Sequence, residues 1–140
     1  MHAPILTLKS PTSLKSLLRA ALAAALVAGA TLAQALEVKP YSADALAAAQ
    51  AAGKPVAVHF HADWCGTCKQ QEKAIAQLKG ESDLDMLLLV ADYDKEKDLR
   101  RSMKVRSQST MVVFRGKEER ARLGGDTEAV KFRQALRAAL

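Results

Sequence analysis

The sequence predicts an α/β fold in which a mixed central sheet of about four strands carries helices on both faces. Two observations lead to this prediction. Short β-branched or continuously apolar runs alternate with helical patterns along the chain, and the last such run is joined by a glycine-containing turn to a further segment that can pair with it as a hairpin. Residues 36 to 140, a stretch of 105, are enough for one small hydrophobic core.

The first 35 residues have the composition of a secretory signal peptide. Three Lys and Arg side chains and no acidic residue precede an apolar run from Ala20 to Leu32, and Ala33-Gln34-Ala35 supplies a small-residue cleavage site. The 13 residues of the run fall short of the ~20 that a membrane-spanning helix needs. We therefore expect a cleaved signal peptide at 1 to 35, followed by a single domain at 36 to 140.

Half of the formal net charge of the chain comes from this leader. Its removal lowers the formal net charge from +6 to +3, because 18 Lys and Arg then stand against 15 Asp and Glu. The remaining charges are mixed in sign and aromatic residues make up only 4% of the chain, so nucleic-acid binding is disfavoured. Export to a periplasm, an oxidising compartment, would tend to keep a cysteine pair oxidised.

The first half of the domain reads as helix, strand, helix. Ser42 can cap an alanine-rich helix that stops at Gly53, and the β-branched run Val56 to Phe60 follows as a short strand. A second helix should run from Cys65 to about Lys79, ended by Gly80.

The second half reads as strand, helix, hairpin, helix. The apolar run Met86 to Asp92 has the length and composition of a buried strand, and the charged DKEKDLRRSM suits a short exposed helix. An antiparallel hairpin should pair Met111 to Phe114 with Glu118 to Leu123. The last helix, capped by Asp126 or Thr127, has its apolar residues at helical spacing, namely Ala129, Phe132, Leu136 and Ala139.

The two cysteines, Cys65 and Cys68, decide the functional interpretation. As a structural staple, a bridge between residues three apart would contribute only roughly 2 kcal/mol. The pair instead follows a strand and opens a helix, where unpaired N–H groups favour a Cys65 thiolate. Thiol–disulfide exchange uses this arrangement, with Cys65 attacking and Cys68 resolving. Gly66 would let a partner chain approach, and Trp64 offers it an apolar surface.

Metal binding is an alternative use of the same cysteines. His59 and His61 precede the pair, and residues two apart on a strand point to the same face. With Cys65 and Cys68 they could form a site for copper(I) or zinc in a metal-binding or metal-delivery module. The common zinc spacings are absent, and either histidine is also compatible with a packed or surface position.

The region around the cysteines resembles the thioredoxin superfamily. ADWCGTCK is similar to its WCxxCK signature, and ADWC followed by CKQQEK looks most like the C-terminal thioredoxin-like domain of DsbD, a periplasmic thiol–disulfide interchange reductant. ADYDKEKDLRRSMKVRSQSTMVVFRGKE and LGG continue the similarity. The resemblance implies a thioredoxin fold and a redox-active Cys65–Cys68 disulfide with no further cofactor. It also implies Cys65 as nucleophile, Cys68 as resolving cysteine, and Trp64, Gly66 and Thr67 on the partner-binding side.

Two residues depart from the family pattern. His59 stands where many thioredoxins have a buried aspartate, so it is either the proton acceptor for the resolving thiol or a neutral packing residue. Ser109 stands where the family has a cis-proline before the threonine at Thr110, and a trans bond is expected before a non-proline residue. Gln108 and Ser109 are candidates for contact with a partner chain.

The sequence thus predicts a monomeric thiol–disulfide oxidoreductase of the periplasm. It would reduce disulfides in client proteins and take electrons from a membrane thiol carrier. The Gly66-Thr67 dipeptide does not fix the reduction potential, so a disulfide-forming oxidant on the same fold remains a second alternative beside the metal module. A third is a redox-inert binding domain.

Overall fold

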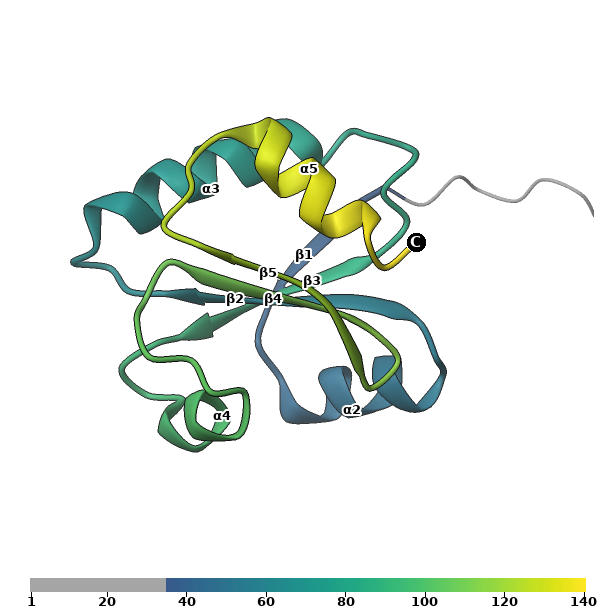
Figure 1. Cartoon of the computed structure of the whole chain (residues 1–140), viewed down its shortest axis with the longest axis horizontal. Coiled ribbons are helices and arrows are strands. Elements are labelled where there is room, and N and C mark those ends of the chain that lie inside the picture. Colours follow the sequence, from purple (N-terminus) through teal and green to yellow (C-terminus); the bar gives the residue numbers. More distant parts are fainter. Residues whose placement is uncertain (1–34) are drawn as a thin grey trace, which may run out of the picture. The chain divides into compact units, whose positions relative to one another are not determined.

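The computed structural model describes residues 35–140, which form a five-stranded mixed sheet of order β1-β3-β2-β4-β5 with helices on both faces (Figure 1). β1 and β2 are parallel to β3, whereas β4 is antiparallel to β2 and to β5. In chain order, the elements are β1 (Glu37–Pro40), α2 (Ala43–Ala51), β2 (Pro55–His61), α3 (Gly66–Leu78), β3 (Leu87–Asp92), α4 (Lys97–Ser102), β4 (Thr110–Arg115), β5 (Glu118–Gly124) and α5 (Ala129–Arg137).

Each face of the sheet has its own apolar core. On one face, α3 and α5 pack through Ile75, Leu78, Phe132 and Leu136 against Leu88 and other strand residues (Figure 1). On the other face, Leu46 of α2 packs with the inward side chains of β2 and β4, and Leu99 of α4 lies at its margin. The predicted α/β fold is therefore confirmed, and β2 lies at its centre, covered on both sides.

The helices begin largely where local signals predict. Ser42 caps α2 by accepting a hydrogen bond from Ala45 N at 3.4 Å, and Cys65 caps α3. The expected capping of α5 by Asp126 or Thr127 is wrong, because the cap position is Glu128, which makes no side-chain cap hydrogen bond. The backbone carbonyl of Asp126 instead accepts a hydrogen bond from the side chain of Gln71, which ties the segment before α5 to α3.

The sheet has one strand more than the sequence predicts. β1 is a four-residue edge strand that pairs only with β3 and ends at Pro40. Its charged residues and its proline are typical of an edge, where one side of the ladder stays unpaired. Leu36 and Val38 turn toward the α3–α5 core, so this short segment closes the end of the core.

Four segments meet at one end of the sheet because of this topology. β2 and β3 run parallel and end there, whereas the antiparallel β4 begins there, with Phe60 opposite Thr110. The end of β5 lies beside the start of β4, with Thr110 opposite Gly124. The CxxC turn, the segment after β3, the loop before β4 and the loop after β5 therefore converge.

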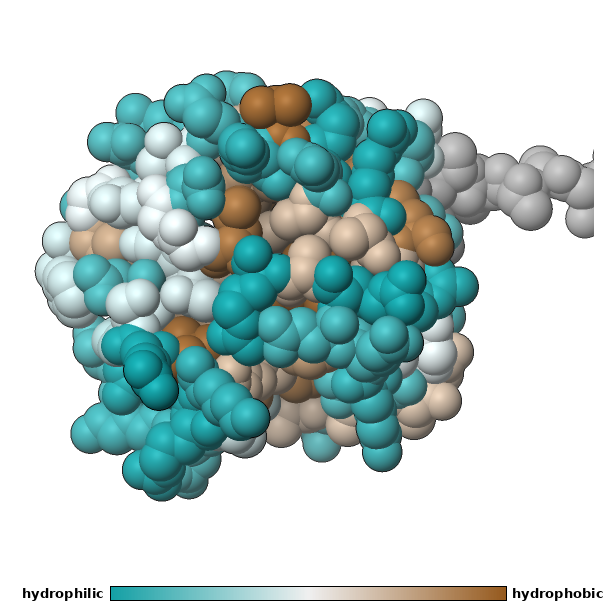
Figure 2. Space-filling view, viewed as in Figure 1, coloured by the Kyte–Doolittle hydropathy of each residue, from teal (hydrophilic) through white to brown (hydrophobic). Residues whose placement is uncertain are grey.

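Hydrophilic side chains dominate the face shown in Figure 2, and apolar ones form small separate patches. Within residues 35–140, no helix has the length and apolar character required to cross a bilayer. The predicted signal peptide lies, apart from Ala35, outside the described residues, and its cleavage stays a prediction.

Candidate active site

Cys65 and Cys68 form a disulfide at the start of α3, with their Cα atoms 5.2 Å apart. Cys65 is the N-cap, and its Sγ accepts the backbone N–H of Cys68 at 3.0 Å. The Cys65 sulfur therefore takes the place of a capping oxygen and faces the positive end of the helix dipole. A negative charge on this sulfur would be stabilised by the same N–H group, which favours the thiolate.

The two cysteines differ in access. Cys68 is fully buried in the first turn of α3, whereas Cys65 retains 4% exposure in the oxidised state and follows Trp64, which is 63% exposed. The Trp64 indole N–H donates to Asp94 Oδ2 at 2.8 Å, which fixes the ring beside the pair. Gly66 is exposed, and a side chain there would meet no atom within 4 Å. The Cys65 side of the turn is thus open to a partner.

Ser109 lies against both sulfurs. Its peptide bond is trans, as expected, because the described residues contain no cis bond. Its Oγ is 3.1 Å from Cys65 Sγ and 3.3 Å from Cys68 Sγ, and the residue is buried. Gln108, the other predicted contact residue of this loop, is only half-buried. Of the two residues predicted for this loop, the structure thus places Ser109 against the sulfur atoms.

Gln71 is a site residue that the sequence did not reveal. It lies on α3, one turn after Cys68, and is fully buried. Its amide nitrogen donates to the backbone carbonyls of Ser109 at 3.0 Å and Asp126 at 2.8 Å, so both amide hydrogens are used. Gln71 therefore ties the loop before β4 and the loop after β5 to the helix that carries the cysteines.

The same amide fixes the tautomer of His59. Because the Gln71 nitrogen is committed to two carbonyls, its Oε1 must accept from His59 Nε2–H, 2.7 Å away. His59 Nδ1 is then unprotonated, is buried and has no hydrogen-bond partner among the described residues. Burial lowers the pKa of His59 below its ordinary value of about 6.5, and the hydrogen bond to Gln71 only partly opposes this. At neutral pH His59 is uncharged, and any proton it receives goes to Nδ1.

This shift predicts a pH-dependent stability. The folded protein binds the His59 proton less readily than the unfolded chain. The contribution of neutral His59 to the free energy of unfolding is therefore fully present above about pH 6.5 and is lost as the pH falls toward the lower folded pKa. Unfolding by urea at several pH values should show a falling free energy of unfolding below pH ~6.5 in the wild type. The slope should be shallower in His59→Gln. Parallel curves for the two proteins would contradict a depressed His59 pKa.

The structure does not assemble the predicted metal-ligand set. His59 Nε2 is engaged by Gln71, and the two sulfurs are bonded to each other. His61 Nε2 lies 3.1 Å from Glu72 Oε1, in a geometry that does not make a hydrogen bond. Among residues 35–140, no three His, Cys, Asp or Glu side chains converge as metal ligands. The alternative site of Cys65, Cys68, His59 and His61 is therefore not supported.

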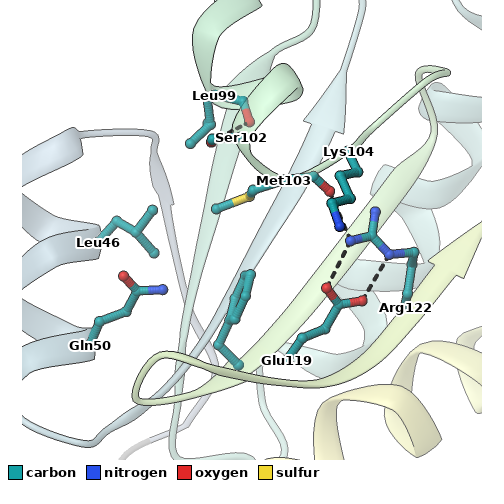
Figure 3. A pocket seen from close by; sticks show the side chains of 9 residues that line it. Leu46, Gln50, Leu99, Ser102, Met103, Lys104, Glu119 and Arg122 are labelled. Atoms are coloured by element: carbon teal, nitrogen blue, oxygen red, sulfur yellow. Dashed lines mark hydrogen bonds and ion pairs between the residues drawn. The ribbon is translucent and has the colours of Figure 1, made fainter.

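A surface pocket lies apart from the cysteines, between α2, α4 and the β4–β5 hairpin (Figure 3). Leu46, Met103 and Phe114 line its apolar part, and the Glu119–Arg122 ion pair lines one side. None of the predicted site residues lines it. The cysteine pair thus lies at an end of the sheet and not in this pocket.

Comparison with known proteins matches this geometry to one family. The sequence pattern of the family described as Thioredoxin covers residues 37–138. The chain belongs to the thioredoxin family. Thioredoxin-1 of Drosophila yakuba is 33% identical over 75 residues, covering 54% of this chain and 70% of that protein. A solved structure of Trxlp from Edwardsiella tarda shares 34% identity at a TM-score of 0.67, over 71% of this chain and 98% of that one.

The chain is also similar to DsbD, but this similarity does not single DsbD out from the thioredoxins. Thiol:disulfide interchange protein DsbD of Salmonella typhi is 34% identical over 95 residues, which cover 61% of this chain and 17% of that protein. Thioredoxins match at comparable identity. Family membership and the cysteine geometry together make this chain a thioredoxin-like thiol–disulfide oxidoreductase, whose redox group is a disulfide with no further cofactor.

Proposed function

We propose that this protein is exported to the periplasm and reduces disulfides in client proteins, with electrons supplied by a membrane thiol carrier. The observation that carries the site assignment is the position of Cys65, where the sulfur caps α3 and accepts the Cys68 N–H. The same thiolate that this N–H stabilises is the nucleophile of disulfide exchange. Cys68, fully buried behind it, is the resolving cysteine.

The exchange proceeds in two steps. The Cys65 thiolate attacks one sulfur of a client disulfide, which forms a mixed disulfide and releases the other client sulfur as a thiolate that takes a proton. The Cys68 thiol then loses its proton and attacks Cys65 Sγ, which forms the Cys65–Cys68 bond and releases the second client sulfur. Two electrons pass from the protein pair to the client. A dithiol carrier in the membrane returns them by the reverse exchange.

The residues around the pair support two further roles in this proposal. Trp64, held by Asp94, together with Gly66 and Thr67, forms the side on which a client docks. His59 accepts the Cys68 proton at Nδ1 during resolution, because this nitrogen is the unprotonated one and is buried with no hydrogen-bond partner among the described residues. Its lowered pKa ensures that it returns the proton readily.

The direction of electron flow and the compartment can be tested together. The full chain is expressed in a bacterium whose membrane carries a thiol donor, fractionated by osmotic shock, and treated with an alkylating reagent that marks free thiols. We expect the protein in the periplasmic fraction, beginning at Leu36, with Cys65 and Cys68 mainly reduced. Loss of the membrane donor should convert the pair to the disulfide. A pair that is oxidised even with the donor present would indicate a disulfide-forming role instead, and recovery from the cytoplasm would contradict export.

A further inference from the structure

Within residues 35–140, the Ser109 hydroxyl is the one side-chain donor that touches both sulfurs. In the disulfide state neither sulfur carries a hydrogen, so only the hydroxyl can donate, and its single hydrogen is shared between or alternates between the sulfurs at 3.1 Å and 3.3 Å. The family pattern places a proline here, and proline has neither a hydroxyl nor a backbone N–H. This chain therefore has a donor beside the two sulfurs where the family pattern has none.

The backbone at Ser109 is held in an unfavourable conformation that presents this hydroxyl. Its φ of 58° lies in the left-handed region, which glycine adopts without penalty and other residues seldom do. Three hydrogen bonds maintain it. Ser109 N donates to Phe60 O, and Ser109 O accepts from Gly125 N and from Gln71 Nε2, each at 3.0 Å. Glycine would satisfy the backbone better, so the serine at this position points to a use for its hydroxyl.

We propose that Ser109 is a catalytic residue of the exchange reaction, whose hydroxyl donates a hydrogen bond to the Cys65 thiolate and, during resolution, to the Cys68 thiolate. The proposal rests on the exchange mechanism proposed above and assigns a further group to it. In the disulfide state the hydroxyl and the Cys68 N–H already converge on Cys65 Sγ, and we expect them to keep these positions in the reduced protein. Once Cys65 is bonded to a client sulfur, the negative charge develops on Cys68, within reach of the same hydroxyl. The hydroxyl keeps its own proton throughout.

The effect on the chemistry follows from which state the hydrogen bond favours. A hydroxyl binds a thiolate more strongly than a neutral disulfide sulfur, because the acceptor is charged. Ser109 therefore favours the reduced, ionised pair over the disulfide. Its loss should raise the pKa of Cys65 and make the couple more reducing.

The test compares Ser109→Gly with the wild type in the full domain. Thiolate formation, followed by its ultraviolet absorbance, should show the Cys65 pKa about one unit higher in the variant, a tenfold change in ionisation. At a pH above both values, equilibration with glutathione should shift about tenfold toward the disulfide, which corresponds to about 30 mV. Ser109→Gly should melt at the same temperature or higher, because glycine removes the strain at φ 58°.

The pH–rate profile gives a readout that simple damage would not produce. Nucleophilicity rises with thiol pKa at a Brønsted coefficient of about 0.4–0.5, so the variant should react about threefold more slowly at low pH and about threefold faster at high pH. The other ionisable groups around the pair stay in place in the variant, namely His59, His61, Asp63, Lys69, Glu72, Tyr93, Asp94 and Asp126. A crossing of the two profiles therefore reports the hydroxyl alone.

Two further variants separate the hydroxyl from the backbone. Ser109→Ala also lacks the hydroxyl but keeps the strain, so it should share the raised pKa. Ser107→Ala removes an exposed hydroxyl from the same loop and should leave the pKa and the profile unchanged. The proposal is overturned if Ser109→Gly has the wild-type Cys65 pKa, if only Ser109→Ala changes it, or if the rate falls equally at all pH values. Exchange by the wild type remains in each of these cases, so the proposed function would stand.

Discussion

Cys65→Ser is expected to abolish disulfide reduction, with a loss of at least about a thousandfold in the rate of insulin reduction. A serine hydroxyl at the α3 N-cap can still accept the Cys68 N–H, so the helix is expected to form as before. Its oxygen, however, is not ionised at neutral pH and forms no disulfide with a client. The fold would thus remain while the nucleophile is lost.

Ser82→Ala is the control for this prediction. Ser82 is exposed and lies between the end of α3 and the start of β3, at the end of the sheet opposite the cysteines. We expect insulin reduction within about a factor of three of the wild type, since no sulfur chemistry is changed. If Cys65→Ser retained more than a small fraction of the activity while folded, the assignment of Cys65 as nucleophile would be wrong.

Gln71→Leu is expected to lower the free energy of unfolding by about 2–4 kcal/mol, which for a domain of this size is roughly 10–20 °C in melting temperature. Leucine fills a similar volume but makes none of the three hydrogen bonds of the amide. His59 Nε2–H and Asp126 O would lose a partner inside or at the edge of the protein. Ser109 O would keep its bond from Gly125 N, which limits the loss.

Gln70→Leu provides an internal control for Gln71→Leu. Gln70 precedes it on the same helix but is exposed, so the same chemical change should alter the stability by no more than about 0.5 kcal/mol. The measurement is urea unfolding of both variants beside the wild type. Equal effects of the two substitutions would show that the buried amide contributes nothing beyond helix propensity. That result would contradict a stabilising role for the three hydrogen bonds of Gln71.

The parts of the fold that the sequence predicts are those with short-range causes. Ser42 caps α2 through a residue three positions away, and the β4–β5 hairpin forms around a turn at Gly116. β1 was missed because it is only four residues long, carries two charged residues and ends at Pro40, so its pattern has no strand signal by itself. It becomes a strand only because β3 offers it an edge.

In the candidate site, too, the residues with short-range signals were predicted and those that depend on distant contacts were not. Cys65 and Cys68 were identified from the strand, turn and helix around them, and the structure pairs them. Gln71 was missed because a glutamine on a helix ordinarily faces solvent, whereas here its burial depends on Ser109 and Asp126, 38 and 55 residues away. The sequence singled out Ser109 as a departure from the family pattern. That its hydroxyl meets both sulfurs follows only from the convergence of β2 and β4.

The central claim, that Cys65 attacks a client disulfide and Cys68 resolves the product, is tested most directly by trapping. Cys68→Ser expressed in its own compartment should accumulate mixed disulfides with client proteins and with the thiol donor. These complexes should separate on treatment with dithiothreitol and should be absent from the variant that lacks both cysteines. Complexes formed by Cys65→Ser and not by Cys68→Ser would reverse the order of attack. Their absence from both single variants, with the wild type still cycling between its dithiol and disulfide forms, would contradict the mechanism.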